Sequence, residues 1–204
     1  MKTALRILIL ALVLIIALPL VSCKGNSPQI DNVRENFIYL IEESRELNHI
    51  FFGAGLPVYS REDALTEQKM VYFIDELPGF DRINENSEYL SVEEIKADAE
   101  KIYSKDYLLA LYESAFDGIL VGDRGSYIRF YEGDDWLYQN TNATDFNLSE
   151  KIFDYSTMEI AEPSTSEYVN VRIECYSISD GARREYILSF VLQDGGWRLD
   201  SPTY

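Results

Sequence analysis

Few residues of this 204-residue chain are of the types that carry nucleophilic or acid–base chemistry. His49 is the only histidine, and the two cysteines are Cys23 and Cys175. His49 stands at the end of a predicted helix, where histidine commonly interacts with the helix dipole. Cys175 alternates in phase with Val171 and Ile173, as a small buried side chain of a strand does. We therefore predict no catalytic residue, with a Cys175–His49 pair as the minor alternative.

Carboxylates are abundant, but their spacing predicts neither a catalytic pair nor a metal site. Adjacent acids such as Asp134-Asp135 cannot stand across a cleft at the separation that glycoside hydrolysis needs. Calcium takes oxygen ligands, and Asn84, Asn86 and Glu88 alternate oxygen-bearing side chains. The glycine and the terminal glutamate of a calcium loop are missing there, so a polar loop is the preferred interpretation. We expect no metal and no cofactor.

Aromatic residues are numerous, with 15 tyrosines, 10 phenylalanines and 2 tryptophans. Such side chains are typical of binding surfaces, and equally of half-buried strands whose polar tips reach water. Both interpretations stay open. If the aromatic residues serve binding, the candidate contacts lie in a glycine-rich loop and in a predicted hairpin: Phe52, Leu56, Tyr131, Asp134 and Trp136.

The first 22 residues have the pattern of an export signal. Lys2 and Arg6 form a basic start, Ile7–Leu18 is uninterrupted apolar sequence, and Pro19 closes it. An uncleaved membrane helix is the alternative, but the apolar stretch Ile7–Ser22 is shorter than the roughly 20 residues that usually span a bilayer. We expect residues 1–22 to be removed.

The end of this leader, Leu20-Val21-Ser22-Cys23, resembles the bacterial lipobox. The resemblance implies that the sulfur of Cys23 receives a diacylglycerol and that cleavage leaves Cys23 as the first residue of the mature protein. It also implies a lipid-anchored protein on the extracytoplasmic face of the cell membrane, or on the outer membrane of a host with two membranes. Residues 23–29 would be a short polar tether between the anchor and the domain.

The charge limits the class of partner. The chain has 18 basic and 35 acidic residues and a formal net charge of −17. Such a charge argues against binding to nucleic acid, because phosphates repel an acidic surface. It favours solubility and allows a basic protein partner.

Helices are predicted mainly in the first half of the mature chain. Ser91-Val92-Glu93-Glu94 has the pattern of a capping box, in which serine and glutamate satisfy each other's backbone N–H groups. A hydroxyl followed by proline at Ser27-Pro28 is likewise typical of a helix start. The predicted elements are, in order, a helix from Ser27-Pro28 to near Gly53, a strand at Lys69–Asp75, a polar loop up to Leu90, a helix from Ser91, and a helix from Ser104 to Gly118.

Strands are predicted from Ser126 onward. Val169, Val171 and Ile173 alternate with polar residues, which indicates a strand with one buried face. Tyr186 to Leu192 alternate in the same way. The predicted strands are a hairpin of Ser126–Tyr131 and Trp136–Asn140, followed by a meander of Lys151–Ala161, Glu167–Ile178, Arg183–Gln193 and Trp197–Ser201.

Helices followed by an antiparallel meander predict one α+β domain over residues 30–204, with N-terminal helices packed on a curved antiparallel sheet. This order resembles the cystatin-like folds, including the nuclear-transport-factor-2-like group. With Tyr103-Ser104 and the closing Gly196-Trp197-Arg198, the layout also resembles the bacterial DL-endopeptidase inhibitor family. That resemblance implies a non-enzymatic binding or regulatory module that inhibits a cell-wall hydrolase. The alternative is a ligand-binding or enzymatic pocket inside a cystatin-like cone.

Overall fold

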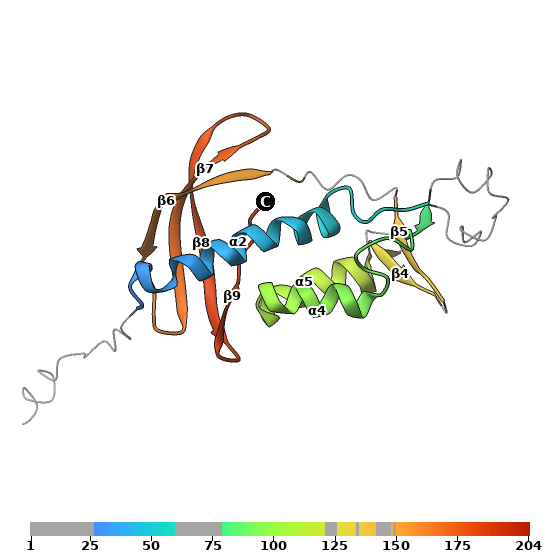
Figure 1. The fold of residues 1–204 in the computed structure, drawn as a ribbon, viewed down its shortest axis with the longest axis horizontal. Coiled ribbons are helices and arrows are strands. Elements are labelled where there is room, and N and C mark those ends of the chain that lie inside the picture. Colours follow the sequence, from blue (N-terminus) through green and yellow to red (C-terminus); the bar gives the residue numbers. More distant parts are fainter. Residues whose placement is uncertain (1–26, 60–78, 121–125, 134, 142–147, 149) are drawn as a thin grey trace, which may run out of the picture.

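The computed structural model describes residues 27–59, 79–120, 126–133, 135–141, 148 and 150–204 (Figure 1). The predicted leader, Cys23, the strand predicted at Lys69–Asp75 and Asp134 lie outside these residues. Helices come first along the described chain and a four-stranded antiparallel meander comes last, so the α+β prediction is confirmed. None of the helices in these ranges is long and apolar enough to cross a membrane.

The longest helix in the described part of the chain is α2, Ile30–Phe52. Its N-cap is Gln29, whose side chain makes no capping hydrogen bond, so the predicted start at Ser27-Pro28 is wrong by a few residues. The extended backbone of Gln29 shows that the helical conformation begins only after it. The predicted end is confirmed, because the Gly53 N–H donates to the His49 carbonyl at 3.0 Å. The apolar face of α2 is fully buried at Phe37 and Ile41.

Two shorter helices follow, α4 (Val92–Ile102) and α5 (Lys105–Tyr112). The predicted capping box is present at the start of α4, where the Glu94 N–H donates to Ser91 Oγ and the Glu94 carboxylate accepts from the Ser91 N–H. Ser104 caps α5 as predicted, by accepting from the Tyr107 N–H. A turn of π-helix, η2 (Glu113–Asp117), continues α5 and ends at Gly118, whose φ of 86° suits glycine.

The main sheet is an antiparallel meander in the order β6-β7-β8-β9. Its inner face alternates as predicted, since Val169, Val171, Ile173 and Cys175 are fully buried. Leu192 is an exception at 40% exposed, because it lies one residue from the end of β8, beside the turn to β9. The bounds of the strands are β6 Lys151–Ala161, β7 Tyr168–Ser177, β8 Arg183–Gln193 and β9 Gly196–Leu199.

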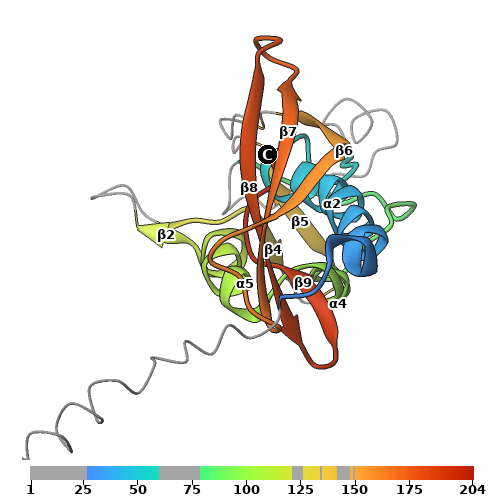
Figure 2. The ribbon, with the colours of Figure 1, turned by 90° about the vertical axis from the view of Figure 1, so that its left-hand side faces the viewer.

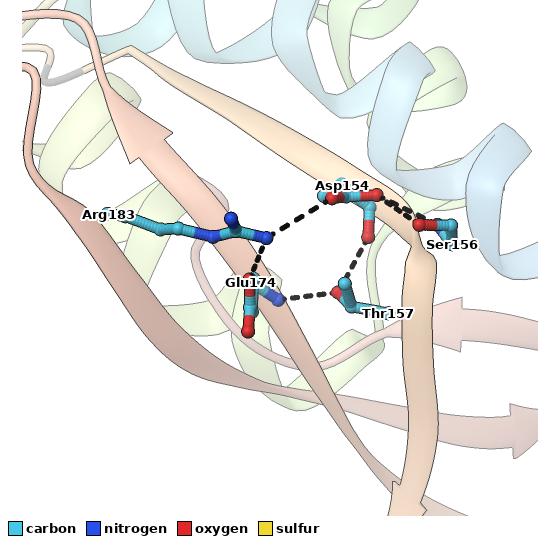
Figure 3. A network of polar contacts seen from close by, with 5 residues as sticks. All are labelled: Asp154, Ser156, Thr157, Glu174 and Arg183. Carbon is cyan, nitrogen blue, oxygen red and sulfur yellow. Dashed lines mark hydrogen bonds and ion pairs between the residues drawn. The ribbon is translucent and has the colours of Figure 1, made fainter.

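A bulge bends β6 between two regular stretches of pairing. Tyr155–Met158 on β6 stand opposite Ile173 alone on β7. Thr157 holds this bulge, because its Oγ1 accepts from the Glu174 N–H at 2.9 Å and donates to the Asp154 carbonyl at 2.7 Å (Figure 3). Arg183 forms ion pairs with both Glu174 and Asp154 across the same place. The bend therefore has its own polar scaffold, as bulges commonly require.

The predicted hairpin forms, but in a second sheet. Strands β4 (Phe130–Glu132) and β5 (Leu137–Asn140) pair with each other, and β5 also pairs with β1 (Phe80–Arg82). β1 lies in the segment predicted as a polar loop, so that prediction is wrong there. Ser126–Tyr131 is not one strand either, because β3 (Ser126–Tyr127) pairs with β2 (Ile119–Leu120) instead. β1 is a strand of three residues, Phe80–Arg82, that forms by pairing with the edge of β5.

The two sheets lie near opposite ends of α2. Figure 1 shows the main sheet where α2 begins and the β4–β5 hairpin where α2 ends, and in the end-on view of Figure 2 the main sheet faces the viewer. Arg129, beside β4, binds the C-terminal end of α2, since its guanidinium donates to the carbonyls of Gly53 at 2.6 Å and Ile50 at 3.3 Å. One continuous cluster of buried apolar side chains runs through both ends.

Candidate functional site

An acidic cleft lies between α2 and α4, with a volume of about 190 Å³. From α2 come the carboxylates of Glu43 and Glu46, and from α4 that of Asp98. Glu88 reaches the cleft from the loop before α4. Among the described residues that line the cleft, Lys101 is the one with a basic side chain. Four carboxylates and one ammonium group therefore face the same hollow.

The acids of the cleft are in two different electrostatic states. Lys101 hydrogen-bonds to Asp98 and lowers the pKa of that carboxyl, and the Tyr89 hydroxyl also donates to Asp98 at 3.0 Å. The pKa of Glu88 is raised, first by desolvation and then by the charge and the hydrogen bond of Glu46. No basic side chain in the described ranges forms an ion pair with Glu46 or Glu88. Within the described residues, the Glu46–Glu88 end therefore has no ion-pair partner for its carboxylates.

The cleft suits an organic cation better than a metal. Among the described residues, no group of three or more histidine, cysteine, aspartate and glutamate side chains is arranged to hold a metal ion. The Asn84–Glu88 segment forms a local turn, in which Asn84 Oδ1 accepts from the Asn86 N–H at 2.9 Å. A cationic side chain entering the cleft would meet the carboxylates of Glu46 and Glu88, and charge-assisted hydrogen bonds to carboxylates are the strong ones.

The predicted contact residues fall into different environments. Tyr131, in β4 of the three-stranded sheet β1-β5-β4, and Trp136, just before β5, are 37% and 42% exposed. We call this three-stranded sheet the small sheet. Phe52 is half-buried, with its ring 4.4 Å from that of Tyr204. Leu56 is buried in the core, 7% exposed, and only its backbone N–H makes a polar contact, donating to Gln139 Oε1. Of the candidates that the structure describes, Tyr131 and Trp136 have the exposure of surface contacts.

Trp136 has a neighbour that sequence reasoning missed. The guanidinium carbon of Arg82 lies 3.1 Å from the centre of the Trp136 ring. Arg82 is itself 5% exposed and forms an ion pair with Glu85 at 3.6 Å. The two residues are 54 positions apart in sequence and meet only because β1 pairs with β5. No local spacing signals this contact.

The two residues considered for nucleophilic chemistry are not hydrogen-bonded to each other. His49 Nε2 lies 3.0 Å from Glu150 Oε1, and both side chains are partly exposed. Cys175 is fully buried, and burial raises the pKa of its thiol. A raised pKa disfavours the thiolate, which is the reactive form.

The inner face of the main sheet is filled. Phe37 of α2 stacks on Phe190 of β8, and Trp197 stands edge-on to Phe37. At the other end of this layer, the Thr203 hydroxyl closes the space by bonding to Ser44 Oγ and Asn48 Nδ2, each at 2.7 Å. This packing leaves the hypothesis of a ligand inside a cystatin-like cone without supporting geometry in the described residues.

A comparison with models of known protein families finds no match, and a search of the curated proteins finds none either. The interpretation of the cleft and of the hairpin therefore depends on their geometry. Part of the cleft had a sequence signal, because Glu43 and Glu46 stand three residues apart on one helix face. Glu88 and Asp98 reach it from another segment, which no spacing rule predicts.

Proposed function

We propose that this chain is a lipid-anchored, extracytoplasmic binding module with no reaction of its own, and that its acidic cleft receives a cationic side chain of a basic envelope protein. The lipobox resemblance at Cys23 supports the anchor. The net charge of −17 supports the choice of a basic partner.

The observation that carries this proposal is the Glu46–Glu88 end of the cleft. Desolvation, and after it the neighbouring negative charge of Glu46, raises the pKa of Glu88. A lysine or arginine side chain would remove this repulsion, which is a gain available to a cation and not to a neutral ligand. A cavity of about 190 Å³ has room for the end of one such side chain.

The resemblance to the DL-endopeptidase inhibitors supports a regulatory role. An acidic module held beside the membrane would meet a basic cell-wall hydrolase rapidly, because complementary charge accelerates encounter. By binding to the hydrolase, this module would then keep the substrate out of the hydrolase's active site. The proposal needs no catalytic residue and no cofactor in this chain.

The cleft is tested with mature, lipidated protein incubated with cell-envelope extract at low and at high salt. We expect a basic protein to be retained at low salt and released at high salt, because screening weakens surface charge pairs. A Glu46→Gln/Glu88→Gln variant should retain less of that protein, and Glu167→Gln, an exposed acid outside the cleft, should match the wild type. Equal retention by all three proteins would refute the role of the cleft.

The anchor is tested separately. Mass spectrometry of the membrane fraction should show an amino-terminal peptide that begins at a lipid-modified Cys23. Cys23→Ser should leave the membrane fraction or keep its leader. An unmodified sulfur, with the leader still attached in a cytosolic fraction, would contradict the anchor and the localisation together.

A further inference from the structure

An exposed aromatic pair lies on the small sheet, β1-β5-β4, at the end of α2 opposite to its start (Figure 1). Tyr131 of β4 and Trp136, just before β5, are 37% and 42% exposed. The Tyr131 ring is 6.3 Å from that of Tyr138 and 6.4 Å from that of Phe80, which is buried. Tyr131 therefore packs against other aromatic side chains of the sheet and has a fixed position.

Trp136 is held in position before any partner arrives. The buried guanidinium of Arg82 lies against its ring at 3.1 Å, which fixes one side of the indole. An ordered aromatic side chain loses less conformational entropy on binding than a mobile one. Tryptophan and tyrosine are also the residues that most often contribute large energies at protein interfaces.

The rim of this aromatic pair is acidic. Asp135 stands next to Trp136 in the hairpin and is exposed, whereas the Glu132 carboxylate accepts from the Val92 N–H at 3.2 Å, at the start of α4. Glu85, whose side chain is 57% exposed, stands beside Arg82. Because the nearby basic group, Arg82, is buried, the surface that a partner meets around Trp136 is aromatic and negative. Charge complementarity then selects a basic partner surface with an apolar side chain at its centre.

The position of the hairpin matches a partner that lies away from the membrane. α2 has 23 residues, so it is about 34 Å long at about 1.5 Å per residue. The tether precedes the start of α2, and the hairpin lies at the opposite end (Figure 1). A domain anchored through residue 23 could thus direct Tyr131 and Trp136 outward.

We propose that Tyr131 and Trp136, with the acidic rim of Glu85 and Asp135, form a docking surface for a basic protein segment that carries an aliphatic side chain. This inference rests on the proposed function, because it identifies a second contact for the same kind of partner. The Trp136 ring takes the aliphatic group and the rim takes the flanking lysine or arginine residues.

The test uses a peptide of alternating lysine and leucine, and the same peptide with glutamate in place of lysine. Binding to the mature protein is measured by calorimetry and by tryptophan emission, which Trp136→Phe assigns to Trp136 as distinct from Trp197. We expect the lysine peptide to bind and to change the Trp136 emission, and the glutamate peptide not to bind. Trp136→Ala should weaken binding by at least about tenfold.

Three further variants make the result specific. Tyr176→Ala removes a tyrosine of similar exposure, 43%, from the main sheet and should change nothing. Asp135→Lys leaves the aromatic pair intact and should also weaken binding. This variant tests the surface even if Trp136→Ala loses binding because it misfolds. Glu46→Gln/Glu88→Gln changes only the cleft.

The outcomes separate the two proposals. If Trp136→Ala and Asp135→Lys bind like the wild type while the cleft variant binds less, the docking surface is refuted and the proposed function stands. If the hairpin variants lose binding and the cleft variant does not, the docking surface stands and the role of the cleft is refuted. Absence of peptide binding, or equal binding of both peptides, overturns the docking surface.

Discussion

Phe37 of α2 lies flat on Phe190 of β8, with ring centroids 3.9 Å apart and ring planes inclined by 7°. Both side chains are fully buried, and they join the longest helix to the inside of the main sheet. Aromatic stacking of this kind adds to the free energy gained from burial. The contact also fills the space in which a cystatin-like cone would hold a ligand.

Phe37→Ala should therefore lower the free energy of unfolding by about 3–5 kcal/mol, because it leaves a cavity against Phe190. Urea denaturation followed by circular dichroism measures this change. Leu109→Ala, on an apolar side chain that is 70% exposed, should change stability by no more than about 0.5 kcal/mol. If Phe37→Ala lowered the free energy of unfolding by no more than Leu109→Ala does, α2 would not pack on the sheet as described.

Thr203 provides a second, polar link to α2. Its hydroxyl bonds to Ser44 and Asn48, which are 0% and 3% exposed, and Asn48 in turn accepts from the Tyr103 hydroxyl at 2.8 Å. Thr203→Val should cost about 1–3 kcal/mol, because it leaves buried polar groups without a partner. Thr203→Ser keeps the hydroxyl and should retain most of the stability. Equal unfolding curves for the two variants would contradict the link.

We make a similar prediction for Thr157, whose hydroxyl bridges the bulge of β6. Thr157→Val removes both the acceptor for the Glu174 N–H and the donor to the Asp154 carbonyl, and should cost about 1 kcal/mol. Hydrogen exchange should be faster at the Glu174 amide in this variant. Thr157→Ser is the control, and unchanged exchange at Glu174 in the valine variant would show that another group holds the bulge.

Asp180 should titrate at unusually low pH. Its hydrogen bonds from Arg184 and from the Ala182 N–H lower its pKa from 3.8 to about 2. Because the folded-state pKa lies below the ordinary value, the stabilisation is present above about pH 3.8 and is lost as the pH falls toward 2. An NMR titration of the Asp180 carboxyl carbon measures the midpoint. Arg184→Gln should move it up toward 3.8, and an ordinary midpoint in the wild type would contradict the ion pair.

The cleft should show two opposite titration shifts. Glu46→Gln should lower the pKa of Glu88 toward 4.5, because it removes a neighbouring negative charge, and Lys101→Met should raise the pKa of Asp98 toward 3.8. Since the folded-state pKa of Glu88 is raised, its ionisation opposes folding, and this contribution to stability improves as the pH falls through that pKa. NMR titration of both carboxyl carbons in each variant provides the measurement.

The same groups make cation binding depend on pH. A lysine side chain in the cleft prefers ionised Glu88, so affinity should increase as the pH rises through the pKa of Glu88. Calorimetric titration with the lysine–leucine peptide at several pH values measures this slope. In Glu46→Gln/Glu88→Gln the slope should be smaller, and an unchanged slope would place the responsible group elsewhere.

Much of the fold was predictable because its signals are local. The Ser91–Glu94 capping box depends on residues within one turn, and it forms as predicted. Period-two alternation over Val169–Cys175 reports which face of a strand is buried, and that face is fully buried. The bounds of β6 and β8 also agree with the prediction, since turn residues flank both strands, but the bulge within β6 was not predicted. The resemblances to the lipobox and to known folds stay predictions.

The candidate sites depended on contacts between distant segments. β1 forms in a segment predicted as a loop because it pairs with β5, and that pairing brings Arg82 against Trp136. The cleft joins acids of α2 to Glu88 and Asp98 only after α4 packs beside α2. Sequence alone determined the helices, the meander and the acidic character of the chain, because these follow from neighbouring residues and composition. Tertiary structure decided which carboxylates share a cleft and which aromatic side chains stay exposed, because that depends on how the segments pack.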